Sequence, residues 1–197
     1  MSDPETLNVY ARQAGDYAAL TDDDNRQDPC LTAFISDMRP GAHVLDLGCG
    51  PGASAAVMAA AGLRVDAFDP VAEMVALAAE TPGVTARQAG FSDLVGEDVY
   101  DGIWANFSLL HAPRDEMPSH LARISRALRQ SGRFHIAVKT GTGAARDKIG
   151  RFYTYYTENE LTGLLLDARL TVFDRWEGTG TGLSGEEAHW IALAARG

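Results

Sequence analysis

The sequence is poor in several features that mark particular classes of protein. It has only two cysteines among 197 residues, Cys30 and Cys49, so a disulfide framework is excluded and a reducing compartment, the cytoplasm, is expected. No apolar run reaches the ~18 to 20 residues that cross a bilayer, so we expect no membrane segment. Lys and Arg number 17 against 27 Asp and Glu, and this net charge of −10 disfavours a nucleic-acid partner.

The remaining composition is that of an ordinary globular protein. Hydrophobic residues make up 46% of the chain and charged residues 22%. The length predicts one domain over residues 1–197, with a helical cap over 1–40 and a sheet core over 41–197. The histidines and cysteines lack the spacing of metal ligands, so we expect no metal site.

The spacing of apolar residues predicts alternating strands and helices. Helices are expected over 7–20 and 28–38, followed by strands over 43–47, 64–68, 84–88, 100–105 and 133–139. Helical segments over 53–61, 71–80, 114–129 and 158–168 separate or follow these strands. The alternation predicts an α/β fold with a mostly parallel sheet and helices on both faces.

The end of the chain breaks this alternation. Strands predicted over 170–176 and 189–194 have only the glycine-rich segment 178–185 between them, which predicts a hairpin and an antiparallel last strand. A second glycine-rich segment, 140–150, is expected to form a polar, mobile loop near a site.

The most informative stretch is residues 44–52, Val-Leu-Asp-Leu-Gly-Cys-Gly-Pro-Gly, where an apolar strand runs into a glycine loop and then a helix. Glycines allow a backbone to turn tightly and to approach a ligand closely. Asp69 ends the next strand about 20 residues after Gly50, where a carboxylate can accept from both hydroxyls of a ribose. The combination indicates a cofactor that contains a nucleoside.

The glycine spacing alone fits two kinds of cofactor. Residues 48–53 also satisfy the G-x-G-x-x-A pattern of dinucleotide-binding proteins. Asp46, shortly before Gly48, would repel the pyrophosphate of NAD but would attract the positive charges of S-adenosylmethionine. The charge therefore favours S-adenosylmethionine.

Residues 44–52 and Asp69 resemble the first motif and the ribose-binding acid of the class I S-adenosylmethionine-dependent methyltransferases. Residues 100–105, 108–111 and 128–133 are similar to later, looser motifs of that family, especially in small bacterial members that act on small molecules. The resemblance implies a Rossmann-like sheet of seven strands, mostly parallel, with an antiparallel last strand.

The chain departs from the family's pattern after the third strand. Where an acidic residue usually takes the adenine amino group, this sequence has Gly90. Either Asp93 replaces that acid, or the backbone of Gly90, Phe91 and Ser92 contacts the adenine edge, with Phe91 as an aromatic neighbour of the ring.

Tyrosines, a histidine and an arginine supply further candidates. Tyr10 and Tyr17 fall on one face of the predicted first helix, and in similar proteins such tyrosines close over the methionine end of the cofactor. His111 follows the fourth strand and is a candidate general base, while Arg151 and Tyr153 follow the 140–150 loop and are candidates for substrate binding. The residues expected to contact the cofactor are Tyr10, Asp46, Gly48, Cys49, Gly50, Asp69, Pro70, Met74, Gly90, Phe91, Ser92, Asn106 and Phe107.

The sequence thus predicts an enzyme that methylates a small-molecule acceptor with S-adenosyl-L-methionine, without metal, membrane or nucleic acid. A non-catalytic S-adenosylmethionine-binding or regulatory protein is the main alternative, because it would keep the same glycine loop. An NAD-dependent oxidoreductase is a further alternative, which Asp46 disfavours.

Overall fold

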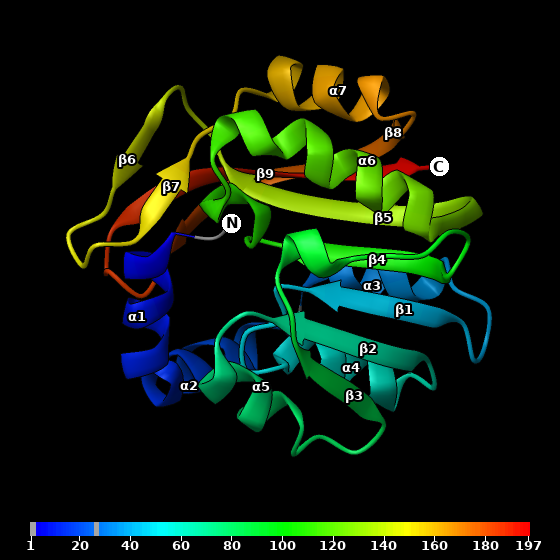
Figure 1. Cartoon of the computed structure of the whole chain (residues 1–197), viewed down its shortest axis with the longest axis horizontal. Helices are drawn as coiled ribbons and strands as arrows, with labels where there is room; N and C mark the ends of the chain where they lie inside the picture. Colours follow the sequence, from blue (N-terminus) through cyan, green and yellow to red (C-terminus); the bar gives the residue numbers. More distant parts are fainter. Residues whose placement is uncertain (1–2, 26–27) are drawn as a thin grey trace.

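The computed structural model describes residues 3–25 and 28–197, and of residues 21–25 the backbone alone. Its frame is a seven-stranded sheet with the strand order β3-β2-β1-β4-β5-β9-β8 (Figure 1). The strands of this sheet are β1 (His43–Leu47), β2 (Arg64–Asp69), β3 (Val84–Gln88), β4 (Tyr100–Asn106), β5 (Leu128–Lys139), β8 (Thr171–Thr181) and β9 (Glu187–Arg196).

The strand directions confirm the predicted topology. Neighbouring strands among β1 to β5 pair in parallel, whereas β9 is antiparallel to both β5 and β8. The chain runs outward from β1 to β2 and β3 on one side and returns to β4 and β5 on the other. Such a reversal opens a crevice at the carboxyl ends of the central strands, where α/β proteins bind their ligands.

Helices cover both faces of the sheet, as expected for parallel strands (Figure 1). One face packs on Leu31, Phe34 and Met58 of the first helical layer, and the other on Leu121 and Leu161 of the second. The first layer consists of α3 (Pro29–Ser36), α4 (Ala53–Ala60) and α5 (Ala72–Ala78), and the second of α6 (Met117–Ala127) and α7 (Glu158–Asp167). None of the helices in the described part of the chain is long and apolar enough to cross a membrane.

The prediction of one continuous helix over 7–20 is wrong. The structure has α1 (Pro4–Arg12) and α2 (Ala14–Asn25), separated at Gln13, whose backbone leaves the helical region with φ −116°. The two helices pack on different neighbours, α1 on α5 and α2 on α4, so tertiary contacts override the continuous apolar spacing. Tyr10 and Tyr17 therefore come from two helices, although their ring centroids lie only 5.4 Å apart.

The interpretation of residues 140–150 as a plain loop is also wrong. Part of this segment is β6 (Ala144–Arg146), which pairs antiparallel with β7 (Phe152–Thr154). This two-stranded ribbon lies beside α1, beyond the end of the main sheet (Figure 1). Short 3-10 turns, η1 (Phe91–Asp93), η2 (Leu109–His111) and η3 (Arg114–Glu116), complete the described elements.

Candidate active site

A cavity of about 560 Å³ lies beyond the carboxyl ends of β1, β2, β4 and β5. The helices α1 and α2, the ribbon and the turn between β8 and β9 enclose it. The predicted site residues that line it are Tyr10, Asp46, Gly48, Cys49, Gly50, Asp69, Pro70, Met74, Phe91, Asn106, Phe107, His111, Arg151 and Tyr153. The structure thus brings together residues predicted from widely separated segments.

The glycine loop follows β1 and has no room for a side chain at Gly48. Gly48 has φ +80°, and a Cβ there would lie 2.3 Å from the Cβ of Ser108, whose hydroxyl donates to the Leu47 carbonyl. The amides of Gly48 and Cys49 both donate to the Phe68 carbonyl, at 2.7 and 2.9 Å. These bonds fix the loop against the end of β2, so that its backbone forms one wall of the cavity.

Asp69 ends β2 directly beneath this loop. Its Oδ2 accepts from the Gly50 amide and its Oδ1 from the Val71 amide, both at 2.9 Å. Burial raises its carboxyl pKa to about 6, and the two amide hydrogen bonds oppose that rise. Each carboxylate oxygen has a further lone pair, so a ligand diol can still bind there.

Asp46 is a second buried acid in the cavity, and its hydrogen bonding is less complete than that of Asp69. It is 3% exposed, and its Oδ2 has no hydrogen-bond partner among the described residues. Burial, followed by the negative charge of Asp69, raises its pKa to about 8. A buried oxygen without a partner is costly, so this position suits a ligand group that donates hydrogen bonds and carries positive charge.

The residues predicted at the adenine end are only partly in the cavity. Phe91 lines it, whereas Gly90 and Ser92 lie outside its lining. The carboxylate of Asp93 accepts from the Gly90 amide at 2.8 Å and so caps its own turn. The hypothesis that Asp93 replaces the missing adenine-binding acid stays a prediction.

At the opposite end, four groups form one chain of hydrogen bonds. Nη1 of Arg151 donates to the Tyr10 hydroxyl at 3.0 Å, and that hydroxyl lies 3.0 Å from Nε2 of His111. Nδ1 of His111 lies 2.6 Å from the Phe152 carbonyl, which only accepts, so the proton is on Nδ1. Nε2 is therefore the acceptor for Tyr10.

Burial determines the charge states of the groups in this hydrogen-bond network. It lowers the pKa of His111 to about 4, with the positive charges of Arg151 and Lys139 acting in the same direction, so the imidazole is neutral near pH 7. Arg151 itself is buried and forms an ion pair with Asp147, with Nη2 and Oδ2 2.8 Å apart. The sequence predicts that Arg151 helps to bind an anion or a ring of the substrate, but its charge is already balanced by Asp147.

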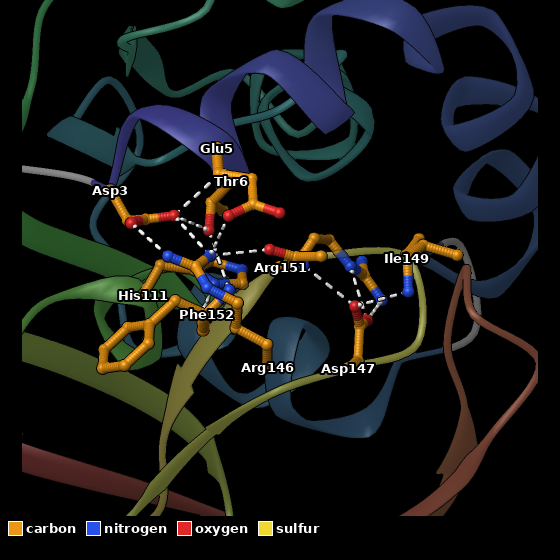
Figure 2. A network of polar contacts seen from close by, with 10 residues as sticks. Asp3, Glu5, Thr6, His111, Arg146, Asp147, Ile149, Arg151 and Phe152 are labelled. Carbon is orange, nitrogen blue, oxygen red and sulfur yellow. Dashed lines mark hydrogen bonds and ion pairs between the residues drawn. The ribbon is translucent and has the colours of Figure 1, made fainter.

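The ribbon is held against α1 by a second polar network (Figure 2). Arg146 donates from both terminal nitrogens to the carboxylate of Asp3, each at 2.8 Å, and also pairs with Glu5. The Thr6 hydroxyl accepts from the Phe152 amide at 2.8 Å. Together with the Tyr10–His111 bond, these contacts close α1 over the cavity.

Aromatic residues behind β4 shape the remaining wall. Phe107 has φ +51°, an uncommon value for an aromatic residue, and its ring packs edge-on against Trp190 with centroids 6.1 Å apart. The Asn106 amide oxygen lies 3.2 Å from Nε2 of His135, whose ring stacks on Trp104. Strained backbone of this kind clusters at ligand-binding sites.

The sequence analysis missed Lys139, Trp190 and Ser108. Lys139 is the last residue of β5, and Ser108 follows β4, so the rule that ligands bind beyond strand ends would have found both. Trp190 lies within β9, and no sequence signal marks it, because its place in the cavity depends on the pairing of β9 with β5.

Comparison with known proteins accounts for this arrangement. A family described as "Methyltransferase domain" matches residues 44–132. The crystal structure of 1,6-didemethyltoxoflavin-N1-methyltransferase from Burkholderia thailandensis, with 1,6-didemethyltoxoflavin and S-adenosylhomocysteine bound, superimposes with a TM-score of 0.73. The two are 29% identical, and the match covers 100% of this chain and 91% of that one.

The chain belongs to the class I S-adenosylmethionine-dependent methyltransferase family.

Other methyltransferases match less of their length or at lower identity. The cypemycin N-terminal methyltransferase of a Streptomyces species is 33% identical over 139 residues, which are 67% of this chain and 56% of that relative. This chain therefore spans little more than half of that protein. A methyltransferase from Methanosarcina mazei, 19% identical with a TM-score of 0.71 over 86% of this chain and 97% of that one, shares the fold.

The cofactor of this methyltransferase is S-adenosyl-L-methionine, and the geometry of the cavity fits it. The unpartnered Oδ2 of Asp46 suits a group such as the cofactor's ammonium, and Asp69 keeps lone pairs that a ribose diol can use. A pyrophosphate beside Asp46 would instead bring like charges together at a buried position.

Proposed function

We propose that this methyltransferase transfers the methyl group of S-adenosylmethionine to a small molecule bound in the same cavity. The observation that carries the proposal is the cavity's division into two unlike ends. One end holds the buried acids Asp46 and Asp69, and the other holds His111, Tyr153 and Trp190. A cofactor and an aromatic acceptor would thus lie together in one enclosed space, where proximity supplies much of the rate.

On the cofactor side, each acid has a proposed role. Asp46 accepts from the ammonium group through Oδ2, and Asp69 accepts from both ribose hydroxyls while the Gly50 amide keeps it in place. The backbone of residues 48–50 contacts the methionine end, which Tyr10 closes. Pro70, Met74, Asn106 and Phe107 complete this subsite, with Phe91 at the adenine edge. The backbone of Gly90 and Ser92, which lie outside the cavity lining, stays a predicted contact of that edge.

When bound, S-adenosylmethionine supplies a methyl group activated by a sulfonium centre for in-line transfer. The chain needs no covalent nucleophile for such a reaction, so its residues orient the partners and exclude water. His111 is the proposed proton acceptor, because Nε2 is its unprotonated nitrogen and accepts a hydrogen bond from Tyr10 at the cavity wall. Its low pKa means that it takes a proton only from an acceptor that has become acidic.

The nature of the acceptor is supported by the similar proteins. The Burkholderia enzyme was solved with a small molecule, 1,6-didemethyltoxoflavin, and S-adenosylhomocysteine bound. The cavity of this chain, at about 560 Å³, is of the size that holds a cofactor with a small organic molecule.

The free, buried Cys30 and Cys49 also support the cytoplasm as its compartment.

Two measurements test the proposal. Titration calorimetry should show binding of S-adenosylhomocysteine and no binding of NAD, and tight NAD binding would overturn the cofactor assignment. Incubation of the enzyme with methyl-labelled S-adenosylmethionine and a metabolite extract, followed by mass spectrometry, should then yield a labelled small molecule. Cofactor binding without any labelled product from broad extracts would favour a binding protein over an enzyme.

A further inference from the structure

Lys139 occupies a distinctive position in the cavity. It is the last residue of β5 and pairs in register with Trp190 on β9, so the two side chains lie on the same face of the sheet. Its Nζ lies 3.9 Å from the centroid of the Tyr153 ring, and both residues line the cavity. Lys139 and Lys148 are the only lysines in the sequence.

The charge of Lys139 has no matching anion in the described part of the chain. The charge of Arg151, its cationic neighbour, is balanced by Asp147. Arg151 also donates a hydrogen bond from Nη1 to the Tyr10 hydroxyl. Lys139 makes no ion pair with a described carboxylate, and Asp147 and Glu186 act on it only at longer range. Burial and the charge of Arg151 both lower its pKa, and Asp147 and Glu186 oppose this only in part.

The surfaces around Lys139 are flat and aromatic. The Tyr153 ring lies against its ammonium group, and Trp190 packs edge-on with Phe107. Space for the Trp190 ring comes from Gly178 on β8, where a Cβ would lie 2.7 Å from the indole. A planar ligand would find ring contacts on these surfaces and one cation to pair with.

We propose that Lys139 binds the methyl acceptor, and that this acceptor is a planar heterocycle or aromatic acid that enters the cavity as an anion. The inference rests on the proposed function, because it concerns the acceptor end of the same site. An anion would supply the counter-charge that Lys139 lacks, in a chain whose overall charge of −10 otherwise repels anions. Lys139 is thus a residue that selects the charge of the acceptor.

This assignment also explains how transfer proceeds beside a weakly basic histidine. An acceptor that ionises in solvent before it binds brings no proton to be removed in the cavity, so the role proposed for His111 as proton acceptor applies only to an acceptor that binds protonated. The lone pair of the ionised acceptor then forms the new bond to the methyl carbon as the methyl–sulfur bond breaks, and the electron pair stays on sulfur. One negative and one positive charge disappear in the step, which a poorly solvated cavity favours.

The test compares charged and neutral planar probes in the presence of S-adenosylhomocysteine. Lumazine at pH values above and below the pKa of its N–H group forms one pair of probes. 2-Naphthoate and 2-naphthamide form the other pair, and all are titrated by calorimetry. The wild-type protein should bind the anionic member of each pair at least about tenfold more tightly. Lys139→Met should lose this preference, Lys139→Arg should keep most of it, and the exposed Lys148→Met is the matched control.

A second measurement reads Lys139 directly. With 13C-labelled lysine the protein gives side-chain signals for two residues, which the Lys148→Met variant assigns. We expect the pKa of Lys139 to lie below the ordinary value of a lysine and to rise when the anionic probe binds. The proposal would be overturned if the pKa of Lys139 did not change when the anions bind. It would also be overturned if the wild-type protein bound the neutral member of each pair more tightly.

The two proposals fail in different ways. If the wild-type protein does not bind S-adenosylhomocysteine, the proposed function itself fails. If it binds S-adenosylhomocysteine normally but binds neither anion, only the assignment of Lys139 fails. Cofactor affinity of the Lys139→Met variant should stay within about threefold of the wild type, because Lys139 lies at the acceptor end.

Discussion

The hydroxyl of Tyr10 lies 3.0 Å from Nε2 of His111, although the two residues are 101 positions apart in the sequence. This bond joins the first helix to the turn after β4, and Arg151 donates to the same hydroxyl. The lone pair that would serve as a base is therefore held by a residue of the helix that closes the cavity. Helix closure and the chemistry at His111 are coupled through one oxygen atom.

Tyr10→Phe removes that oxygen and should change both neighbours. Buried Arg151 loses an acceptor and His111 loses a donor, so we expect the free energy of unfolding to fall by about 1–3 kcal/mol. Without the Tyr10 donor, the neutral imidazole is less favoured and the pKa of His111 should rise from about 4. Denaturant titration and NMR measure the two effects. Tyr155→Phe is the control, and an unchanged His111 pKa would contradict the coupling.

His111→Asn tests the role of the imidazole in transfer. If His111 takes a proton, the single-turnover rate with saturating cofactor should fall by about 10²- to 10⁴-fold. Because His111 also bonds the Phe152 carbonyl, stability will fall too, so the rate must be measured per folded molecule. A rate close to that of the wild type would leave proximity as the mechanism, as expected for an acceptor that binds already deprotonated.

Asp46→Asn should alter the pH dependence of stability. The folded pKa of Asp46, about 8, lies above its ordinary value of 3.8, so the folded state holds a proton that the unfolded state releases. The stability linked to this proton is lost as the pH rises through about 8. Between about pH 7 and pH 9 the variant should gain roughly 1 to 2 kcal/mol relative to the wild type.

The comparison with the wild type isolates Asp46, because the buried histidines contribute equally to both proteins. Thermal melts across this range without ligand give the measurement. Saturating S-adenosylhomocysteine should shrink the difference, since an ammonium group beside Oδ2 stabilises the charged carboxylate. Parallel pH curves for the two proteins would contradict the raised pKa.

Asp69→Ala should weaken cofactor binding by roughly 2 to 4 kcal/mol, because a charged acceptor of two hydroxyl hydrogen bonds is lost. The structure adds a second cause, since the carboxylate also holds the Gly50 amide and thus the glycine loop. Calorimetry with S-adenosylhomocysteine measures the change, with the exposed Glu73→Gln as control. A loss below about threefold would place the ribose elsewhere.

Arg146→Gln should loosen the closure of the cavity without unfolding the protein. Arg146 holds Asp3 and Glu5 of the N-terminal segment from the ribbon (Figure 2). Amide hydrogen exchange over α1 should speed up, while the melting temperature changes little because the pairs are partly exposed. Arg175→Gln, which removes similar pairs on β8, should leave α1 unaffected.

The sheet and the cofactor end were predictable because their signals are local. The glycine loop, Asp46 and Asp69 lie within one strand–loop–helix–strand unit, where spacing alone determines which groups meet. The break at Gln13 was missed because the apolar spacing continues across it, and only packing of α1 and α2 on different helices reveals it.

The acceptor end was less predictable because its contacts span the whole chain. The Arg146–Asp3 pair joins residues 143 positions apart, and a charged pair at such separation leaves no periodic pattern. Arg151 was predicted to bind the substrate, because it follows the glycine-rich loop and precedes several tyrosines. Its partner Asp147 is four positions earlier, but only the turn between β6 and β7 buries both side chains together.

The tryptophans offer one more consequence. Of the three in the chain, Trp104 and Trp190 both line the cavity. Trp104 is fully buried and stacked on His135 at 3.6 Å, so its surroundings are fixed, whereas Trp190 borders the space beside Phe107. Trp190 is therefore an intrinsic fluorescence probe of the cavity. Its emission should shift when a ligand occupies that space, and Trp190→Phe should abolish the shift.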